Sequence, residues 1–311
     1  MDSTGSESTL FDKYYHIRHM TSLREIESEI SNDRSFSAYA LGHLEKELFE
    51  KSKFYLSEST NSRGIVMHST GLGNTSITIG DSKAISAILS IYPGNRHSYL
   101  VTGAEEHLPI LRKYYHVEKI TYLQRMMVNP QHFSPQNGQV ERLSGTHINA
   151  LNNLYLPGGG PYFSQSKTVE QAVYFGIFNN GILVAAGGSH VVAPNQQIAV
   201  VGNIFTDFNF RGKGYATNIT SAITQQLLDY GCTDVILSVD PENKPAVLAY
   251  KKLGFKKPTN NSIDSVSDRD FAIDFLYAAA VCAMHLSRLA EDFIILNSDA
   301  YNLIGFKDKM L

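Results

Sequence analysis

The sequence has few cysteines and no excess of charge of either sign, and both shortages exclude classes of protein. Its 311 residues include only two cysteines, Cys232 and Cys282, which lie far apart in the chain. Two such cysteines cannot form a disulfide framework and are typical of a reducing compartment. With 27 Lys and Arg against 30 Asp and Glu, the chain has no basic field for nucleic acid. We therefore expect a cytoplasmic protein without a nucleic-acid partner.

Long hydrophobic runs are also lacking. The most apolar stretch, residues 275–284, is bounded by charged side chains at Asp274 and Arg288. About 20 consecutive apolar residues are needed to cross a bilayer, so we expect no membrane partner. The polar first residues do not resemble a secretory signal peptide. With 43% hydrophobic and 18% charged residues, the chain has enough apolar content to form folded cores.

Strand-like and helix-like patterns alternate twice along the chain, which predicts an α/β (α+β) protein with two mixed-sheet domains. Residues 81–91 have helical spacing after a candidate N-cap, Asp81, and Asn179–Gly181 predict a two-residue hairpin. The stretch 129–138, with two prolines, predicts a linker. The expected divisions are a disordered start at 1–10, domains at 11–128 and 139–257 joined by that linker, and a tail at 258–311.

The tail differs from the rest in its pattern. From Asp270 to Leu296 apolar residues recur at spacings of three or four, which predicts one long helix. An isolated apolar stripe is unstable in water. The stripe therefore favours association into a homo-oligomer or packing back on the body of the protein.

The stretch 200–217 carries the main chemical signal. An apolar strand is followed by Arg211-Gly-Lys-Gly-Tyr-Ala216, which opens a helix. Amides at a helix N-terminus favour anions such as pyrophosphate, although a glycine-rich turn with two solvated basic residues is an alternative. A Walker A loop is excluded because Asp207 stands where its first glycine belongs, and a dinucleotide fingerprint because Thr217 replaces its third glycine.

A second motif follows about thirty residues later. It reads Asn243-Lys-Pro-Ala-Val-Leu-Ala-Tyr250-Lys-Lys-Leu-Gly-Phe255. Together the two motifs resemble the GNAT superfamily of acetyl-CoA-dependent N-acetyltransferases over residues 139–257. Residues 11–128 more weakly resemble the degenerate first half of tandem GNAT proteins.

The resemblance implies acetyl-CoA as co-substrate, no metal, and a role for particular residues. Tyr250 would protonate the leaving thiolate, although a core aromatic residue is the alternative. Strand amides would pair with the pantetheine arm, one of them polarising the thioester carbonyl, and amides of the glycine-rich turn would hold the pyrophosphate. The implied cofactor-binding residues are Ile204, Phe205, Thr206, Arg211, Gly212, Lys213, Gly214, Tyr215, Ala216 and Asn243.

A general base is also required, because an ammonium must lose a proton before its nitrogen attacks. His190, at the end of a predicted strand, is the first candidate and Asp207 the second. A strand-end histidine bonded to a backbone carbonyl is the alternative. Tyr162 and Phe163 would line an acceptor pocket, or else anchor an ordinary loop.

Residues 261–271 and 284–296 resemble argininosuccinate lyase of the fumarase/aspartase superfamily. The resemblance covers about fifty residues of this sequence and lacks that family's catalytic serine loop and histidine region, so we expect no lyase activity. The junction at 258 also leaves no room for the strands that close a GNAT sheet after Phe255. We expect those strands to be missing or replaced.

The expected function is transfer of an acetyl group from acetyl-CoA to the amine of a small molecule or amino acid, by direct attack in a ternary complex. The alternatives are a non-catalytic acyl-CoA-binding or assembly module, or a fusion fragment linked to arginine biosynthesis. The last rests on family analogy alone.

Overall fold

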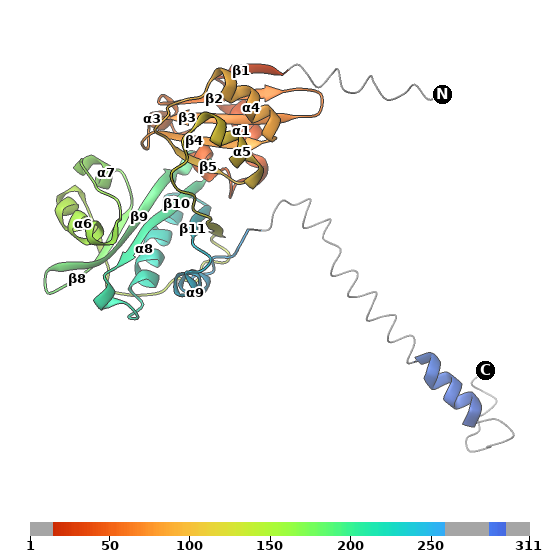
Figure 1. Ribbon diagram of the computed structural model, residues 1–311. Coiled ribbons are helices and arrows are strands. Elements are labelled where there is room, and N and C mark those ends of the chain that lie inside the picture. Colours follow the sequence, from red (N-terminus) through yellow and green to blue (C-terminus); the bar gives the residue numbers. More distant parts are fainter. Residues whose placement is uncertain (1–14, 259–285, 297–311) are drawn as a thin grey trace. The chain divides into compact units, whose positions relative to one another are not determined.

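The computed structural model describes residues 15–258 and 286–296, and the chain divides into two units, Met1–Pro258 and Thr259–Leu311 (Figure 1). The predicted disordered start, 1–10, lies outside the described residues. In the second unit residues 286–296 form a helix, within the range where one long helix is predicted. The remainder of that predicted helix is not among the described residues.

The first unit contains two mixed sheets, as the sequence predicts. In the first sheet the strands follow chain order, and only β4 and β5 are parallel. This pair needs a crossover connection, which α4 (Ser82–Ile91) supplies. The strands are β1 (His16–Met20), β2 (Ser52–Glu58), β3 (Arg63–Ser69), β4 (Thr75–Gly80) and β5 (Tyr99–Thr102).

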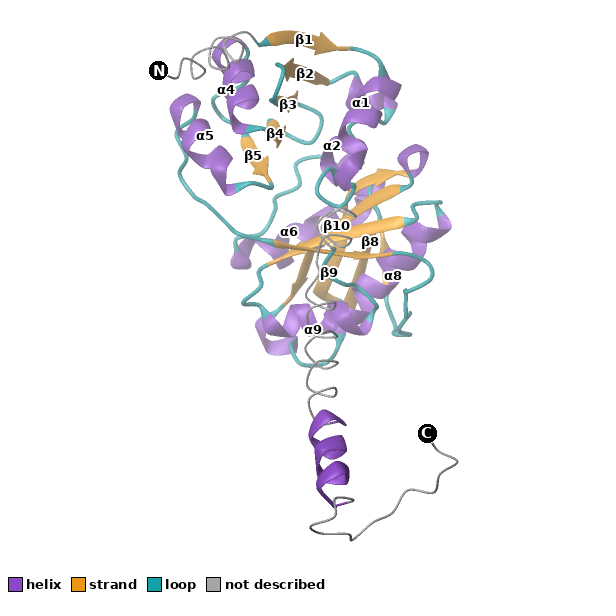
Figure 2. Cartoon of the chain, turned by 90° about the vertical axis from the view of Figure 1, so that its right-hand side faces the viewer, coloured by secondary structure: helices purple, strands orange, loops and turns teal. Residues whose placement is uncertain are grey.

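Helices cover both faces of the first sheet (Figure 2). On one face α4 packs with α5 (Leu108–Tyr114) around buried Ile85, Ile88 and Leu111. On the other lie α1 (Leu23–Ile30) and α2 (Ala38–Gly42), followed by the short α3 (Lys46–Phe49). Helix α4 begins where predicted, because the Asp81 carboxylate accepts the amides of Lys83 at 2.8 Å and Ala84 at 3.3 Å.

The second sheet has the order β6-β11-β10-β9-β8-β7, and only β10 and β11 are parallel. The predicted hairpin joins β8 to β9 through Asn180 and Gly181, which both have positive φ, 50° and 77°. The strands are β6 (Gln124–Val128), β7 (Glu141–Leu143), β8 (Tyr174–Asn179), β9 (Ile182–Ala193), β10 (Ile198–Thr206) and β11 (Asp234–Val239). The helices are α6 (Ile148–Tyr155), α7 (Ser166–Glu170), α8 (Tyr215–Asp229) and α9 (Lys244–Lys252).

Strand β6 belongs to the second sheet, although the sequence analysis placed its residues with the first half. It pairs antiparallel with β11, and Met127 exchanges two backbone hydrogen bonds with Lys256, at 2.8 and 2.9 Å. An apolar pattern reveals a strand but not the sheet that it joins. The edge beside β11, where closing strands were expected to be missing or replaced, is thus occupied by a strand from earlier in the chain.

One buried cluster joins the two sheets. Residues of α1 and α2 pack in the same buried cluster as Val191 of β9, Val200 of β10 and Ile236 of β11. At Gly42 a Cβ would collide with the side chain of Val191, so helix α2 approaches β9 closely. Arg34 adds a polar link, with Nε 2.7 Å from an Asp234 carboxylate oxygen and Nη2 2.7 Å from the Gln196 carbonyl. The positions around α2 are therefore fixed relative to the second sheet.

Candidate active site

Strands β10 and β11 part after four paired positions. Their ladder ends at Val201 opposite Leu237. Beyond it β10 pairs only with β9, while Ser238 and Val239 of β11 pair only with β6. A register shift between Gly202 and Phe205, with Asn203 at φ 55°, bends β10 there. The backbone of β10 from Gly202 to Thr206 consequently has no ladder partner on its β11 side.

The candidate residues Ile204, Phe205 and Thr206 lie on this unpaired part of β10. Ile204 packs against the core beside α8, and the Phe205 ring lies 6.1 Å from the ring of Tyr155. The Thr206 hydroxyl is buried without a hydrogen-bond partner among the described residues. A buried hydroxyl left unpaired is costly. It therefore marks a place where a polar ligand would fit.

The glycine-rich turn leads directly into α8. Gly212 and Gly214 have φ values of 78° and 79°, a conformation that side chains rarely adopt. A Cβ at either glycine would meet nothing within 4 Å, so the backbone conformation and not space requires glycine here. Gly214 is the N-cap of α8 and offers no side-chain acceptor. The first amides of α8, from Tyr215 and Ala216 onward, are thus open to an anion.

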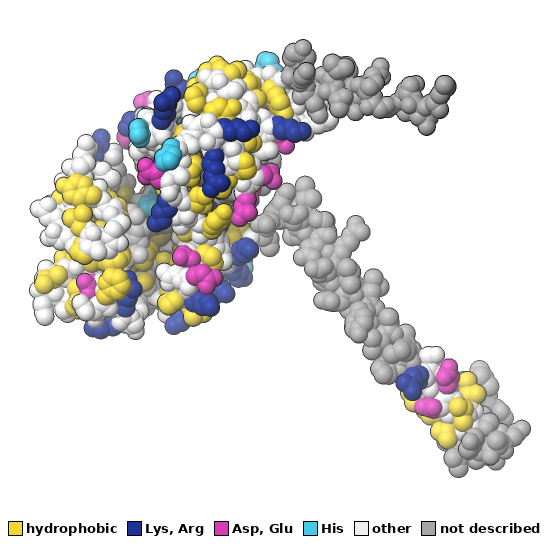
Figure 3. Space-filling model, viewed as in Figure 1, with side chains coloured by type: hydrophobic (Ala, Val, Ile, Leu, Met, Phe, Trp, Pro, Cys, Tyr) yellow, Lys and Arg dark blue, Asp and Glu magenta, His cyan; other side chains and the backbone are white. Residues whose placement is uncertain are grey.

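Basic side chains flank this helix start. The Arg211 guanidinium lies 3.8 Å from the centroid of the exposed Phe208 ring, and its Nε donates to the Thr206 carbonyl at 3.2 Å. Lys213 Nζ lies 5.0 Å from the Phe210 ring, in the short helix η7 (Phe208–Phe210). Figure 3 shows Lys and Arg side chains around this turn and over α9. The turn therefore combines open amides with positive charge.

Between α8 and α9 lies an open groove of about 510 Å³. Asn243 is the N-cap of α9, and its side-chain oxygen accepts the Ala246 amide at 3.3 Å. The capping contact uses that oxygen and leaves the Asn243 NH₂ group for a ligand. The groove is lined by Thr217, Pro245, Leu248, Ala249, Lys251 and Lys252.

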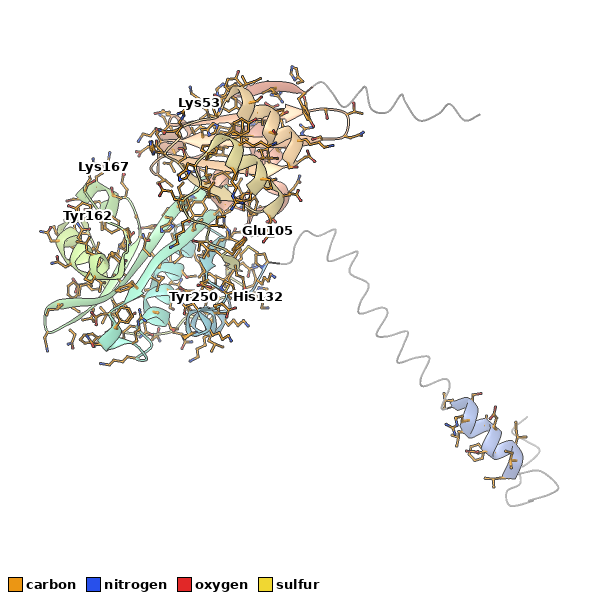
Figure 4. All side chains as sticks on the ribbon, viewed as in Figure 1. Lys53, Glu105, His132, Tyr162, Lys167 and Tyr250 are labelled. Carbon is orange, nitrogen blue, oxygen red and sulfur yellow. The ribbon has the colours of Figure 1, made fainter. Side chains whose placement is uncertain are left out.

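Tyr250 projects from α9 into the core beneath the second sheet and is labelled in Figure 4. Its side chain is 7% exposed, and its ring lies 6.2 Å from that of Phe255. Burial raises the pKa of Tyr250 to about 12, so the hydroxyl keeps its proton at neutral pH. This environment suits both a proton donor and a core aromatic residue, and the role of Tyr250 stays a prediction.

His190 does not end its strand, because β9 continues to Ala193. It lies at a register shift between β9 and β10. Ser189 is opposite Val201 and Val191 is opposite Val200, so His190 is the extra residue between the two pairs. A Cβ at Gly202 would collide with the His190 ring, so that glycine permits the close approach. His190 Nδ1 lies 2.8 Å from the Tyr39 hydroxyl oxygen. The bulge therefore directs the His190 side chain toward α2.

Burial lowers the pKa of His190, and the Asn203 side chain acts weakly in the opposite direction. His190 is therefore neutral at pH 7 and can accept a proton. The second candidate base, Asp207, caps η7, and its carboxylate accepts the Asn209 amide at 2.9 Å. The assignment of the general base to His190 or Asp207 stays a prediction.

Tyr162 and Phe163 lie in the loop between α6 and α7 and face different surroundings. Tyr162 is 67% exposed (Figure 4), whereas Phe163 is 7% exposed. The Phe163 amide and carbonyl both bond the Asn152 side chain, at 2.8 and 2.9 Å. Phe163 is therefore an anchor of this loop. The proposed pocket role of Tyr162 stays a prediction.

Two further residues, one in contact with His190 and one stacked on the first, could not be found from the sequence. Tyr39 of α2 bonds His190, and burial raises the pKa of Tyr39 to about 12. The Arg125 guanidinium of β6 lies 5.3 Å from the Tyr39 ring centroid. Both residues precede the second half of the chain and belong to no motif. Only the packing of α2 and β6 on the second sheet brings them to the site.

Three histidines in the first unit are held neutral by burial, which predicts acid-sensitive folding. Burial lowers the pKa of His43, His68 and His190. The unfolded chain therefore binds protons more readily than the folded one as the pH falls below about 6.5. We expect the free energy of unfolding, measured in urea, to fall between pH 7 and pH 5, by at most about 1.4 kcal/mol per pH unit for each histidine.

The comparison variant is His190→Gln, which should reduce this pH dependence, while replacement of the exposed His97 by Gln should leave it unchanged. Equal pH dependence in wild type and His190→Gln would contradict the prediction for His190.

No helix within 15–258 or 286–296 is long and apolar enough to span a membrane. In the same ranges no three His, Cys, Asp or Glu side chains come together as a metal site.

Comparison with known families gives two matches. Residues 147–255 match the acetyltransferase (GNAT) family, and residues 224–309 match a lyase family. The two ranges overlap over the end of α8, β11 and α9. The lyase match thus begins earlier than the resemblance seen in the sequence.

Curated relatives match only part of the chain. An argininosuccinate lyase of Pelagibacter ubique is 47% identical over 33% of this chain, and one of Bartonella tribocorum is 62% identical over 18%. The chain spans 21% and 12% of the lengths of these lyases.

Solved structures show the fold. A GCN5-related N-acetyltransferase from Kribbella flavida has a TM-score of 0.51 at 13% identity, covering 71% of this chain and 91% of that one. A Drosophila protein has a TM-score of 0.57 at 11% identity, covering 79% and 96%. The expected fold class is confirmed. Residues 147–255 of the chain therefore match the acetyltransferase (GNAT) family, and its C-terminal portion is similar to argininosuccinate lyase.

Proposed function

We propose that this protein transfers an acetyl group from acetyl-CoA to the amine of a small molecule or amino acid, by direct attack in a ternary complex. The observation that carries the proposal is the parting of β10 from β11 beside the uncapped start of α8. This arrangement offers an unpaired strand edge and an anion site within one domain. Acetyl-CoA, when bound, supplies the thioester that is attacked.

The residues of this chain fit such a co-substrate. Backbone groups of Ile204 to Thr206 lie on the unpaired edge and would pair with the pantetheine arm, and the unpartnered Thr206 hydroxyl adds a hydrogen bond. Amides from Arg211 to Ala216 would hold the pyrophosphate. The free NH₂ group of Asn243 would donate to the same ligand.

The proton-handling residues lie on opposite faces of the second sheet. His190 and Tyr39 lie on the α2 side, whereas Tyr250 packs in the core on the α8 side. Tyr39 keeps its proton, because burial raises its pKa to about 12, and it would donate to Nδ1 of neutral His190 in the tautomer that carries its proton on Nε2. We propose that an acceptor ammonium loses a proton to the Tyr39 oxygen as the Tyr39 proton passes to His190. Tyr250 would donate its proton to the departing sulfur.

Reversing the charge at the helix start tests the anion site. In Arg211→Glu/Lys213→Glu we expect acetyl-CoA to bind at least about tenfold more weakly, because two cations beside the pyrophosphate become anions. Isothermal titration calorimetry measures this loss against a wild-type affinity in the micromolar range, about −8 kcal/mol.

Lys167→Glu is the control, because it reverses an exposed cation on α7. Unchanged acetyl-CoA affinity in the double variant would contradict the proposed anion site and the proposed position of the pyrophosphate.

A second candidate is a non-catalytic acyl-CoA-binding module within an assembly. The observation that favours it is the helix at 286–296, where Leu286, Leu289 and Ile294 have exposed apolar side chains. Homo-oligomer formation through this helix is part of this candidate. Acetyl-CoA binding without acetyl transfer to any amine would support it over the enzyme.

A link to arginine biosynthesis, suggested by the lyase-like portion, predicts glutamate as the preferred amine.

A further inference from the structure

Arg125 is a half-buried cation, and one of its guanidinium nitrogens is buried without a hydrogen-bond partner among residues 15–258 and 286–296. It lies on β6 opposite Ser238 of β11, the first position beyond the last β10–β11 pair. Its Nη1 is fully buried without a hydrogen bond, and Arg125 forms no ion pair within residues 15–258 and 286–296. Its described contact is with the Tyr39 ring, whose centroid lies 5.3 Å from Cζ. Arginine stays charged in proteins, so this guanidinium carries a charge that no side chain in the described part of the chain pairs with directly.

Two other arginines of the same unit, Arg34 and Arg142, have polar partners. Arg34 bonds the Asp234 carboxylate and the Gln196 carbonyl, each at 2.7 Å. Arg142 donates to the carbonyls of Tyr174 and Ala172, at 3.3 and 2.9 Å. A buried charge is costly unless it is paired, and stacking on one aromatic ring offsets only part of that cost. The unfilled position at Arg125 therefore indicates an anionic partner from beyond residues 15–258 and 286–296, and a bound molecule is such a partner.

The acidic group that acts on Arg125 electrostatically does not supply that partner. Asp33 favours the Arg125 cation electrostatically. One of its carboxylate oxygens, however, accepts the Ser35 hydroxyl at 2.8 Å and the Phe36 amide at 2.9 Å. No ion pair joins it to Arg125 in the described part of the chain. Asp33 is thus engaged by its own turn.

The position of Arg125 relates it to the acceptor. Its guanidinium stacks on the same Tyr39 whose hydroxyl lies 2.8 Å from His190 Nδ1. An amine at Tyr39 and an anionic group at Arg125 would therefore be separated by about the size of one aromatic ring. This spacing suits a small molecule that carries both groups. The guanidinium fork matches the oxygens of a carboxylate or phosphate.

We propose that Arg125 binds an anionic group of the acceptor, so that the acetylated substrate is an amine that also carries a carboxylate or a phosphate. This inference rests on the proposed acetyl transfer and adds the substrate class. The bond formed joins the acceptor nitrogen to the acetyl carbon, and the carbon–sulfur bond of the thioester breaks. The ammonium loses its first proton through Tyr39 to His190 before attack, and the nitrogen loses its second proton to water after attack. Tyr250 supplies the thiol proton and regains one from water. Arg125 orients the acceptor and takes no part in the proton transfers.

The test compares amines that differ only in their anionic group. L-amino acids are paired with their C-terminal amides, and O-phosphoethanolamine with ethanolamine, and release of the CoA thiol is measured. We expect at least one anionic amine to exceed its neutral partner in kcat/KM by about 10- to 100-fold. The carboxylate and phosphate pairs distinguish the two kinds of anion. Arg125→Gln should abolish this preference while leaving acetyl-CoA affinity unchanged.

Two outcomes separate this inference from the proposed function. If acetyl-CoA binds and neutral amines are acetylated as well as anionic ones, the role of Arg125 is wrong and acetyl transfer stands. If acetyl-CoA does not bind, the proposed function is wrong. The same amino acids and O-phosphoethanolamine are then tested by thermal unfolding, where no stabilisation of the wild-type protein would overturn the anion site as well. The comparison of paired amines needs no variant, so misfolding of Arg125→Gln would not decide the result.

Discussion

Replacing Tyr250 by Phe is expected to lower kcat for acetyl transfer by about 10²- to 10⁴-fold, the usual contribution of a general acid. The ring is buried and its hydroxyl keeps a proton at neutral pH, because burial raises its pKa to about 12. Phenylalanine retains the packing against Phe255 and removes only the proton donor. Acetyl-CoA affinity should therefore change little. Steady-state kinetics together with calorimetry separate the two quantities.

The matched control is Tyr230→Phe, because Tyr230 is an exposed tyrosine at the end of α8. It should leave kcat and thermal stability unchanged. If Tyr250→Phe kept kcat within about twofold of wild type, below the range of acid catalysis, Tyr250 would be a core aromatic residue. The proton on the sulfur would then come from another source.

Replacing Ile236 by Ala is expected to lower the free energy of unfolding by about 2 to 5 kcal/mol, as is usual for such core truncations. Ile236 is fully buried in the cluster that joins α1 and α2 to the second sheet. Since this core is shared, the loss should reach both halves of the first unit. The chain has no tryptophan, so urea unfolding is followed by circular dichroism, and amide hydrogen exchange resolves the individual strands.

We expect faster exchange in β2 and β3 of the first sheet as well as in β10 and β11. Ile182→Ala, at an exposed position on β9, is the control and should change stability by less than about 0.5 kcal/mol. Unchanged exchange in β2 and β3 would show that the two sheets are stabilised independently, in spite of their common core.

Features specified by neighbouring residues could be predicted from the sequence. The Asn180–Gly181 turn, the Asp81 cap and the start of α8 each depend on a few adjacent residues. The paired motifs ending at Phe255 also pointed to the family whose model matches residues 147–255. In these places local backbone preference and tertiary structure agree.

Features that depend on distant packing could not be predicted. Tyr39 and Arg125 carry no motif, and they approach His190 only because α2 and β6 pack on the second sheet. The bulge at His190 could not be predicted either, because the sequence ILVAAGGSH has the pattern of an uninterrupted strand. The glycine-rich turn at the start of α8 could therefore be predicted from the sequence, whereas the surroundings of His190 could not.

The membership of β6 in the second sheet also sets an order of events during synthesis. The ribosome releases β6 before β7 to β10, and β11 emerges last of all six strands. Until β11 arrives, the backbone groups of β6 that it will bind have no partner in that sheet, and the contact closes a long loop at an entropic cost. The backbone of β6 therefore lacks its β11 partner while most of the second half of the chain is synthesised. During this period, pairing of β6 with strands of other chains competes with folding.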